Sequence, residues 1–252
     1  DYDKDMKRYF CLFLTSLAII LLFVFFRFES EPTVLSIYDE NYSVFQKFIP
    51  FFSNDELSKE FTDLASMAKE KKGTFGIYVK DIYSQDTFSY NETELFYAAS
   101  LYKMPIAAAT LKAFQDGEVK KDDKLTYQQE DYFGGTGSIN ESEFGTEFTI
   151  DEVLNRLLKE SDNSAQNMLI RKLGQNKISE AFGINETKNY FYVNNTATPE
   201  QMRIYFENLA LSEYLDNNNK EILFNKMSST IFDDRVHSGL DTGIKYSHKI
   251  GN

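Results

Sequence analysis

The chain has 252 residues, of which 42% are hydrophobic and 15% aromatic, and this composition is typical of a folded protein rather than a disordered one. Its formal net charge of −12 disfavours binding to a nucleic-acid backbone or to an anionic membrane surface by electrostatics. The single cysteine, Cys11, and the two histidines, His237 and His248, are too few to form a zinc site without carboxylates. We therefore expect no nucleic-acid partner, no metal and no cofactor.

The N-terminal part of the chain carries an apolar run that predicts a membrane anchor. Residues 9–26 contain no charged side chain and are long enough to span a bilayer as a helix. The run ends in phenylalanines rather than in small residues, which favours an uncleaved anchor over a cleavable signal peptide. Lys7 and Arg8 precede it and favour an N-terminus inside the cell, so the rest of the chain would be extracytoplasmic at the cell membrane. The predicted organisation is an N-terminal flank at 1–8 that resembles a cloning remnant, an anchor at 9–27, a tether at 28–53 and one domain at 54–252.

The domain opens with a predicted helix and a predicted hairpin. Asn54 is a suitable cap for a helix over residues 55–71, whose apolar residues recur at helical spacing. Residues 74–82 alternate at period two and predict a strand. A polar turn at residues 84–86 would lead into a second strand over residues 87–90. The first two strands are therefore expected to pair.

The remainder of the domain is predominantly helical in its pattern. We expect a long helix from about Ser100 to Phe114, a turn at the glycine-rich residues 134–137, and a strand around His248. Three further helices are predicted from local start and stop signals: one after the capping box Thr149–Glu152, one over residues 165–173 ended by Gly174, and one after Thr198 with Pro199 at its first position.

Three short motifs follow one another along the chain: Ser-x-x-Lys at Ser100–Lys103, Ser-Asp-Asn at 161–163 and Lys-x-Gly at 249–251. A second Ser-x-x-Lys, at Ser66–Lys69, falls in the middle of the first predicted helix and has no turn to lift its hydroxyl into a cleft. Ser100 instead falls where a helix begins, so unpaired backbone N–H groups there would stabilise an oxyanion. The pattern predicts acyl transfer with Ser100 as nucleophile.

Serine needs a neighbouring base to react at neutral pH, and lysine is a base only when its amine is partly neutral. Lys103 lies one helical turn after Ser100 and would reach its hydroxyl. Burial and a second cation, Lys249, would both lower the pKa of Lys103. Ser161 would carry a proton to the leaving nitrogen, and the Asn163 amide would hold a substrate amide.

The segments 97–103 and 158–165 resemble the class A β-lactamases and their penicillin-binding-protein relatives, and the resemblance extends from about Gly73 to the end of the chain. It implies an α+β fold of the β-lactamase/transpeptidase type, with an antiparallel sheet flanked by helices plus a helical subdomain and an active site between them. It also implies that Ser100 is acylated, that Lys103 is its base and that Ser161 is the proton shuttle. The implied substrate-binding residues are Asn163, Lys249, Gly251 and Asn252, with the backbone N–H groups of Ser100 and Asn252 as oxyanion donors.

The sequence departs from that family in three places. The family has a Glu-x-x-x-Asn segment whose glutamate activates the deacylating water, and no such segment occurs between Asn163 and Thr198. Ile250 replaces the usual threonine or serine. The chain stops at Asn252, where the family continues into two more strands and a closing helix, and this suggests a truncated reading frame. Without the glutamate, deacylation is expected to be slow.

Three functions remain open at this point. The first is a serine hydrolase that forms an acyl-enzyme with β-lactams or with peptidoglycan-like amides. The second is a D-Ala-D-Ala carboxypeptidase, a penicillin-binding protein that acts on cell-wall peptides. The third is a non-catalytic envelope module that binds a ligand with the same fold. Covalent labelling by a penicillin separates the first two from the third, and turnover separates a hydrolase from a trap.

Overall fold

The computed structural model describes residues 54–82, 84–182, 190–234, 236 and 243–251. In this part of the chain no helix is both long and apolar enough to cross a membrane. The flank, the anchor and the tether predicted within residues 1–53 lie outside the described residues, as do His237 and Asn252.

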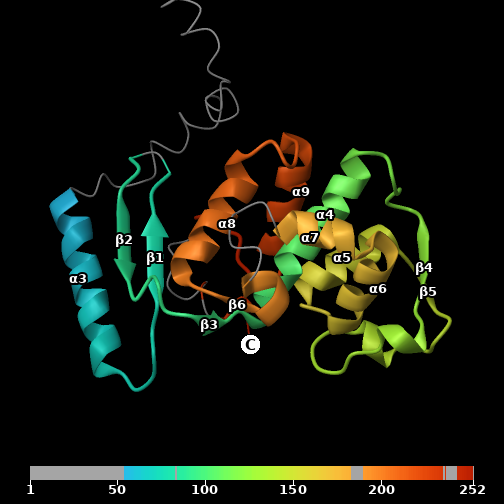
Figure 1. Cartoon of the computed structure of the whole chain (residues 1–252), viewed down its shortest axis with the longest axis horizontal. Helices are drawn as coiled ribbons and strands as arrows, with labels where there is room; N and C mark the ends of the chain where they lie inside the picture. The colour runs from blue at the N-terminus through green and yellow to red at the C-terminus, as the bar shows by residue number, and fades with distance from the viewer. Residues whose placement is uncertain (1–53, 83, 183–189, 235, 237–242, 252) are drawn as a thin grey trace, which may run out of the picture. The chain divides into compact units, whose positions relative to one another are not determined.

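The described residues form an α+β fold in which helices alternate with short strands (Figure 1). In chain order the elements are α3 (Asn54–Glu70), β1 (Ile77–Lys80), β2 (Thr87–Tyr90), β3 (Phe96–Tyr97), the 3₁₀ helix η1 (Ala99–Tyr102), α4 (Lys103–Gln115), β4 (Lys124–Thr126), η2 (Gln129–Asp131), η3 (Ile139–Glu141), β5 (Glu147–Thr149), α5 (Ile150–Lys159), α6 (Asn163–Leu173), α7 (Gln175–Phe182), the π-helical turn η4 (Tyr190–Asn194), β6 (Thr196–Ala197), α8 (Pro199–Leu211) and α9 (Asn217–Ser228).

The described strands pair in three small antiparallel sheets: β1 with β2, β3 with β6, and β4 with β5. The β1–β2 hairpin was predicted, although β1 is shorter than the alternating pattern over residues 74–82. The other two pairs join segments far apart in sequence, with Tyr97 opposite Thr196 and Leu125 opposite Phe148. The β3–β6 pair matters for the site, because β3 leads directly into Ser100.

Helix α4 is the centre of the core. It packs against α5, α6, α7 and α9, which surround it in Figure 1. Its residues from Lys103 to Leu111 are all buried, including three successive alanines at 107–109. A helix that is apolar on every face belongs in an interior, and small side chains let its neighbours approach closely. The first turn of this rigid helix carries Lys103 and follows Ser100 directly.

The predicted helix starts and stops are confirmed at the positions where local capping determines them. Thr149 and Glu152 form the expected reciprocal capping box at the start of α5. Thr198 caps α8, with Pro199 at the first helical position. Gly174 ends α6 with a positive φ of 82°. Local side-chain chemistry therefore fixes these boundaries.

Two predictions about the segments beside the site were wrong. The helix expected from Ser100 begins as the 3₁₀ helix η1, and the α-helix starts only at Lys103. This places Pro105 in the first turn, where an α-helix needs no N–H donor, and so avoids the lost hydrogen bond. The strand expected around His248 does not form: residues 244–251 carry no helix or strand. A strand needs a hydrogen-bonded neighbour, and no described strand pairs with this segment.

Candidate active site

Ser100 and Lys103 meet because both lie where the 3₁₀ helix passes into α4. In a 3₁₀ helix, side chains three residues apart lie almost directly above one another. The Lys103 Nζ accordingly lies 2.9 Å from the Ser100 Oγ. Ala99, in the left-handed region with φ 50°, turns the chain from β3 into this helix. The motif thus places an amine directly against a hydroxyl at a helix start.

The Lys103 side chain is buried, and the amine at its tip contacts polar groups. Its side chain is 1% exposed. Nζ also donates to the Asn163 Oδ1 at 2.6 Å and to the Ser161 Oγ at 3.3 Å. Burial lowers the pKa of Lys103 to about 8, although the negative charge of Asp162 opposes this shift. At pH 7 such an amine is neutral in roughly one molecule in ten, so it can act as a base.

Lys249 approaches the same centre from the C-terminal segment. Its Nζ donates to the Ser161 Oγ at 2.8 Å and to the backbone oxygen of Ile250 at 2.8 Å. Burial and the nearby positive charge of Lys103 lower the pKa of Lys249 to about 7. The Ser161 hydroxyl therefore links two amines that both lose their protons near neutral pH.

Ser161 is held in an unusual backbone conformation. Its φ is +54°, a region that few residues other than glycine adopt, and its side chain is 3% exposed. The hydroxyl of Thr136 donates to the Ser161 backbone oxygen at 2.7 Å. Such strain persists only where surrounding contacts enforce it, and here it aims the Ser161 hydroxyl at the two lysines.

Asp162 is a structural residue of the motif rather than a reacting one. It is fully buried, caps α6 by accepting from the Ala165 N–H at 2.8 Å, and accepts from the Ile139 N–H at 2.8 Å. Gly137 packs against it so closely that a Cβ would lie 2.1 Å from the Asp162 carboxyl carbon. The glycine-rich turn at 134–137 is therefore required by the fit around Asp162.

Asn163, the first residue of α6, connects this loop to the reactive amine. Its Nδ2 donates to the Gly134 oxygen at 2.8 Å, and its N–H donates to the Thr136 oxygen at 3.0 Å. Since its Oδ1 accepts from Lys103, the side chain is fully oriented. The residue expected to contact a substrate amide is thus held at the pocket wall.

The C-terminal motif lies against the start of the Ser100 helix. At Gly251 a Cβ would lie 2.6 Å from the Ala98 oxygen, so only glycine fits this approach. Ile250 lines the pocket where a hydroxyl-bearing residue was expected from the family pattern. The structure therefore brings Ser100, Lys103, Ser161, Asn163 and Lys249 together, with Gly251 beside them.

The second Ser-x-x-Lys motif has a different setting. Ser66 is exposed within α3, and its hydroxyl donates to the Thr62 oxygen one turn earlier at 2.9 Å. Lys69 is exposed as well and lies over the Tyr90 ring. This motif therefore lacks the buried setting of Lys103. Within the described ranges, no three histidine, cysteine, aspartate or glutamate side chains gather in a way that would hold a metal ion.

A pocket of about 540 Å³ opens over Ser100, and several of its walls were not anticipated from sequence. Asn195 lines it and donates from Nδ2 to the Ala99 oxygen at 3.2 Å, while its buried Oδ1 accepts no hydrogen bond from a described residue. Tyr97, Phe133 and Val193 line it with largely exposed apolar side chains. No sequence signal marks these residues, because the long-range β3–β6 pairing and the loop before α6 bring them to the pocket.

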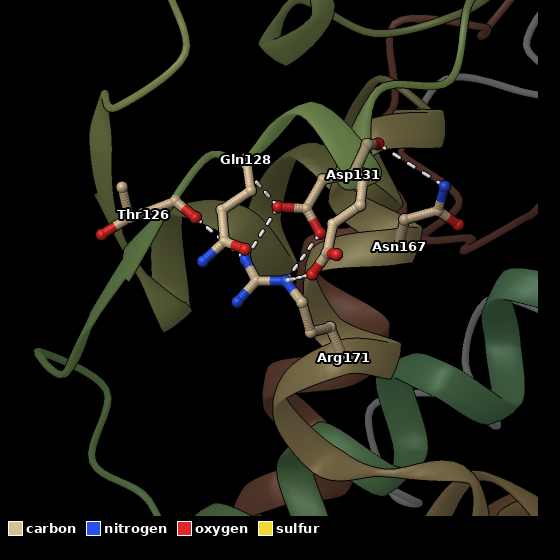
Figure 2. A network of polar contacts seen from close by, with 6 residues as sticks. Thr126, Gln128, Asp131, Asn167 and Arg171 are labelled. Carbon is tan, nitrogen blue, oxygen red and sulfur yellow. Dashed lines mark hydrogen bonds and ion pairs between the residues drawn. The ribbon is translucent and has the colours of Figure 1, made fainter.

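A polar network fixes the loop that leads into the pocket wall (Figure 2). Arg171, in the last turn of α6, donates to both carboxylate oxygens of Asp131, at 2.8 and 2.7 Å, and to the Thr126 oxygen at 2.9 Å. Asp131 is 1% exposed and also accepts from the Gln128 N–H at 2.9 Å. We call the Asp131–Arg171 pair the clamp. It ties β4 and η2 to α6 just before the segment that contains Phe133.

Curated relatives of the chain are β-lactamases. A β-lactamase of Bacillus subtilis (strain 168) is 31% identical over 139 residues, which cover 50% of this chain and 44% of that protein. Beta-lactamase 3 of Bacillus cereus is 25% identical over 203 residues, which cover 74% of this chain and 63% of that protein. The chain spans about half the length of the curated relatives it matches.

Solved structures show the same fold. PBP-A has a TM-score of 0.68 at 23% identity, with 78% of each chain covered, and a mutant of PBP-A in an acyl-enzyme complex with penicillin-G has a TM-score of 0.69. A β-lactamase from Sphaerobacter thermophilus DSM 20745 has a TM-score of 0.65 at 21% identity. The family model described as the β-lactamase enzyme family matches residues 56–252. The chain therefore belongs to the β-lactamase enzyme family.

Proposed function

We propose that this protein is a serine hydrolase that forms an acyl-enzyme at Ser100 with β-lactams or related amides and releases the product slowly. One observation carries the proposal: a continuous hydrogen-bonded chain from Ser100 through Lys103 and Ser161 to Lys249. Membership of the β-lactamase enzyme family and the penicillin-G complex of a PBP-A mutant support the choice of substrate class.

Acylation can proceed with the groups of this chain alone. The neutral Lys103 amine takes the proton of the Ser100 hydroxyl as Oγ attacks the carbonyl carbon. The oxyanion that forms lies near the unpaired N–H groups at the start of η1. When the carbon–nitrogen bond breaks, the Ser161 hydroxyl gives its proton to the leaving nitrogen and recovers one from Lys103 or Lys249. The product is an ester at Ser100 and an amine, which in a β-lactam stays attached to the acyl group because the broken bond belongs to the ring.

Lys249 is the group best placed to bind the carboxylate of such a substrate. Its Nζ is 2.8 Å from Ser161, the proton donor to the leaving nitrogen, so a carboxylate on the nitrogen side of the substrate would meet it. A bound carboxylate favours the charged form of Lys249 and would raise its pKa again. The chain is acidic as a whole, but the surroundings of Lys249 suit an anion.

Deacylation requires a water molecule with its own base, and the pocket offers little help. Of the described residues that line it, none is an aspartate or a glutamate. The free Oδ1 of Asn195 can accept a hydrogen bond from a water, but an amide does not take its proton. General-base assistance is typically worth about 10²–10⁴-fold, so hydrolysis of the ester should be slower than its formation by a comparable factor.

Stopped-flow hydrolysis of a chromogenic cephalosporin tests this proposal. We expect a burst of one product per enzyme, followed by a slow steady state. Mass spectrometry should find the mass of the bound acyl group on the peptide that contains Ser100. A linear trace at rates typical of efficient β-lactamases would show that a deacylating base is present. Glu186, which lies outside the described residues, is then the first residue to replace.

A D-Ala-D-Ala carboxypeptidase is the second candidate, and the shared fold with PBP-A favours it. It would use the same acylation step on a cell-wall peptide and would also be trapped by penicillin. Release of D-alanine from a synthetic peptide ending in D-Ala-D-Ala distinguishes it from a β-lactamase. A non-catalytic ligand binder would give neither a penicillin adduct nor a product.

We also propose that residues 9–26 anchor the protein in the cell membrane with its domain outside the cytoplasm. The uncharged length of this run and the preceding Lys7 and Arg8 support the proposal. A protease added to intact spheroplasts should digest the domain. Full protection would mean that the topology is reversed or that the run is not an anchor.

A further inference from the structure

The pocket over Ser100 has an apolar rim that the acylation step does not use. Tyr97 and Val193 each keep 71% of their surface exposed and Phe133 keeps 55%, although all three line the cavity. Apolar side chains scattered singly on a surface need no explanation, but several around one concavity mark a contact site. We call these three residues the rim.

The rim is built on backbone that tertiary contacts hold in place. Tyr97 lies opposite Thr196 in the β3–β6 pair, and Val193 is in η4, which leads into β6. Phe133 is fixed by its N–H, which donates to the Ser164 hydroxyl of α6 at 3.2 Å. Preformed contacts of this kind cost little ordering entropy when a ligand binds.

The residues around the pocket are of two kinds. Lys103 and Ser161 line it, and the Lys249 amine bonds the Ser161 hydroxyl. The rim residues are apolar, and no described lining residue is an aspartate, glutamate or arginine. If Lys249 binds the carboxylate on the leaving-group side of the substrate, the acyl half of the substrate contacts the rim. A ring there packs against aromatic side chains, whereas a charged group loses hydration without gaining a partner.

We propose that Tyr97, Phe133 and Val193 select substrates whose acyl half carries an aromatic ring. This inference rests on the proposed acylation of Ser100 and adds the substituent that the enzyme prefers. It also sets β-lactams with aromatic side chains apart from cell-wall peptides, whose acyl halves are polar.

The test compares penicillins that share one ring system and differ only in the acyl substituent: phenylacetyl, acetyl, and an aliphatic chain ending in a carboxylate. The second-order rate constant for adduct formation is measured by intact-protein mass spectrometry. We expect the phenylacetyl compound to react about tenfold faster than the acetyl compound, as follows from partial burial of a phenyl ring. The carboxylate-ended compound should be the slowest.

Variants assign this preference to the rim. Phe133→Ser and Val193→Ser should each reduce the phenylacetyl-to-acetyl ratio to about threefold or less. Phe144→Ser and Leu95→Ser are the matched controls, because these side chains are 55% and 52% exposed and do not line the pocket, so the ratio should be retained. A ratio of two substrates on one preparation is independent of the fraction of folded enzyme.

The outcomes distinguish selection by the rim from acylation of Ser100 itself. Equal rates for all three penicillins, or an unchanged ratio in Phe133→Ser and Val193→Ser, would overturn the selection by the rim while the acyl-enzyme stands. Absence of an adduct with every penicillin would overturn the proposed function and this inference with it.

Discussion

At the scale of single residues, the site depends on two lysines that contact one hydroxyl. Lys103 and Lys249 both reach the Ser161 Oγ, at 3.3 and 2.8 Å. Burial lowers both pKa values, to about 8 and about 7. Two ammonium groups that contact the same hydroxyl would repel each other, so the site favours a state in which one of the two amines is neutral. That neutral amine is what a serine nucleophile needs.

The choice between two Ser-x-x-Lys motifs is tested by paired substitutions. Ser100→Ala should abolish covalent labelling by a fluorescent penicillin, because it removes the oxygen that becomes acylated. Ser66→Ala should leave labelling intact, since the Ser66 hydroxyl donates to the Thr62 oxygen of its own helix. Labelling that survives in Ser100→Ala would refute the assignment of the nucleophile.

The rate of acylation should depend on pH through Lys103. The amine accepts the serine proton only when neutral, so the rate constant for adduct formation should fall as pH drops below about 8. Lys103→Arg should lower it by about 10²–10⁴-fold at every pH from 6 to 9, because a guanidinium stays protonated. The measurement is adduct formation against pH at constant ionic strength. A profile that is flat between pH 6 and 9 would exclude Lys103 as the base.

Several residues of the site could be predicted from sequence, because their motifs are short and local. The Ser100–Lys103 spacing is one turn, and the Lys103 amine contacts the Ser100 hydroxyl as that spacing predicts. The positive φ of Ser161 and the unpaired Oδ1 of Asn195 could not be predicted. Both result from contacts with residues far away in sequence, which a single sequence does not reveal.

At the scale of elements, helix α6 joins the site to the clamp. Asn163 begins the helix and contacts Lys103, while Arg171 in its last turn holds Asp131 of η2 (Figure 2). The segment between η2 and η3 then returns to the start of α6, where Thr136 bonds Ser161. The two ends of one helix thus fix the two ends of the loop that forms a wall of the pocket.

Breaking the clamp should destabilise the fold. Arg171→Leu leaves the buried carboxylate of Asp131 without its partner, which should cost about 2–3 kcal/mol of unfolding free energy, a value reduced because Arg171 is partly exposed. Lys177→Leu is the control, because it removes an ion pair with Glu118 in which both side chains are exposed, and we expect little change. Urea unfolding measures both. Equal effects of the two substitutions would contradict a special role of the clamp.

The accuracy of the predicted elements follows the range of the contacts that form them. The starts of α5 and α8 depend on reciprocal caps between residues three apart, and both were predicted. The pairs β3–β6 and β4–β5 join two- and three-residue strands separated by many residues, too short to leave a periodic pattern. The segment around His248 alternates between apolar and polar residues as a strand does, yet a strand also needs a neighbour to pair with.

At the scale of the whole molecule, the two lysines link stability to pH. In the unfolded chain their pKa values return to about 10.5, whereas in the fold they are about 8 and about 7. Between pH 7 and 10 the unfolded state therefore binds more protons than the folded state. Under that condition the free energy of unfolding rises with pH. Burial lowers the pKa of Lys220 as well, and this adds an effect of the same sign.

We therefore expect the free energy of unfolding to increase between pH 7 and pH 9.5, by up to about 5 kcal/mol. Burial raises the pKa values of Tyr102, Tyr205 and Tyr214, which has the opposite effect on stability, but tyrosines in the unfolded chain begin to ionise only near the upper end of this range. Urea unfolding at several pH values and constant ionic strength measures the slope, and Lys249→Met should reduce the slope because one of the two depressed amines is removed. A stability that stays constant or falls over this range would mean that both lysines remain protonated in the fold. In that case neither amine would be a base at neutral pH, and the acylation step would need a different proton acceptor.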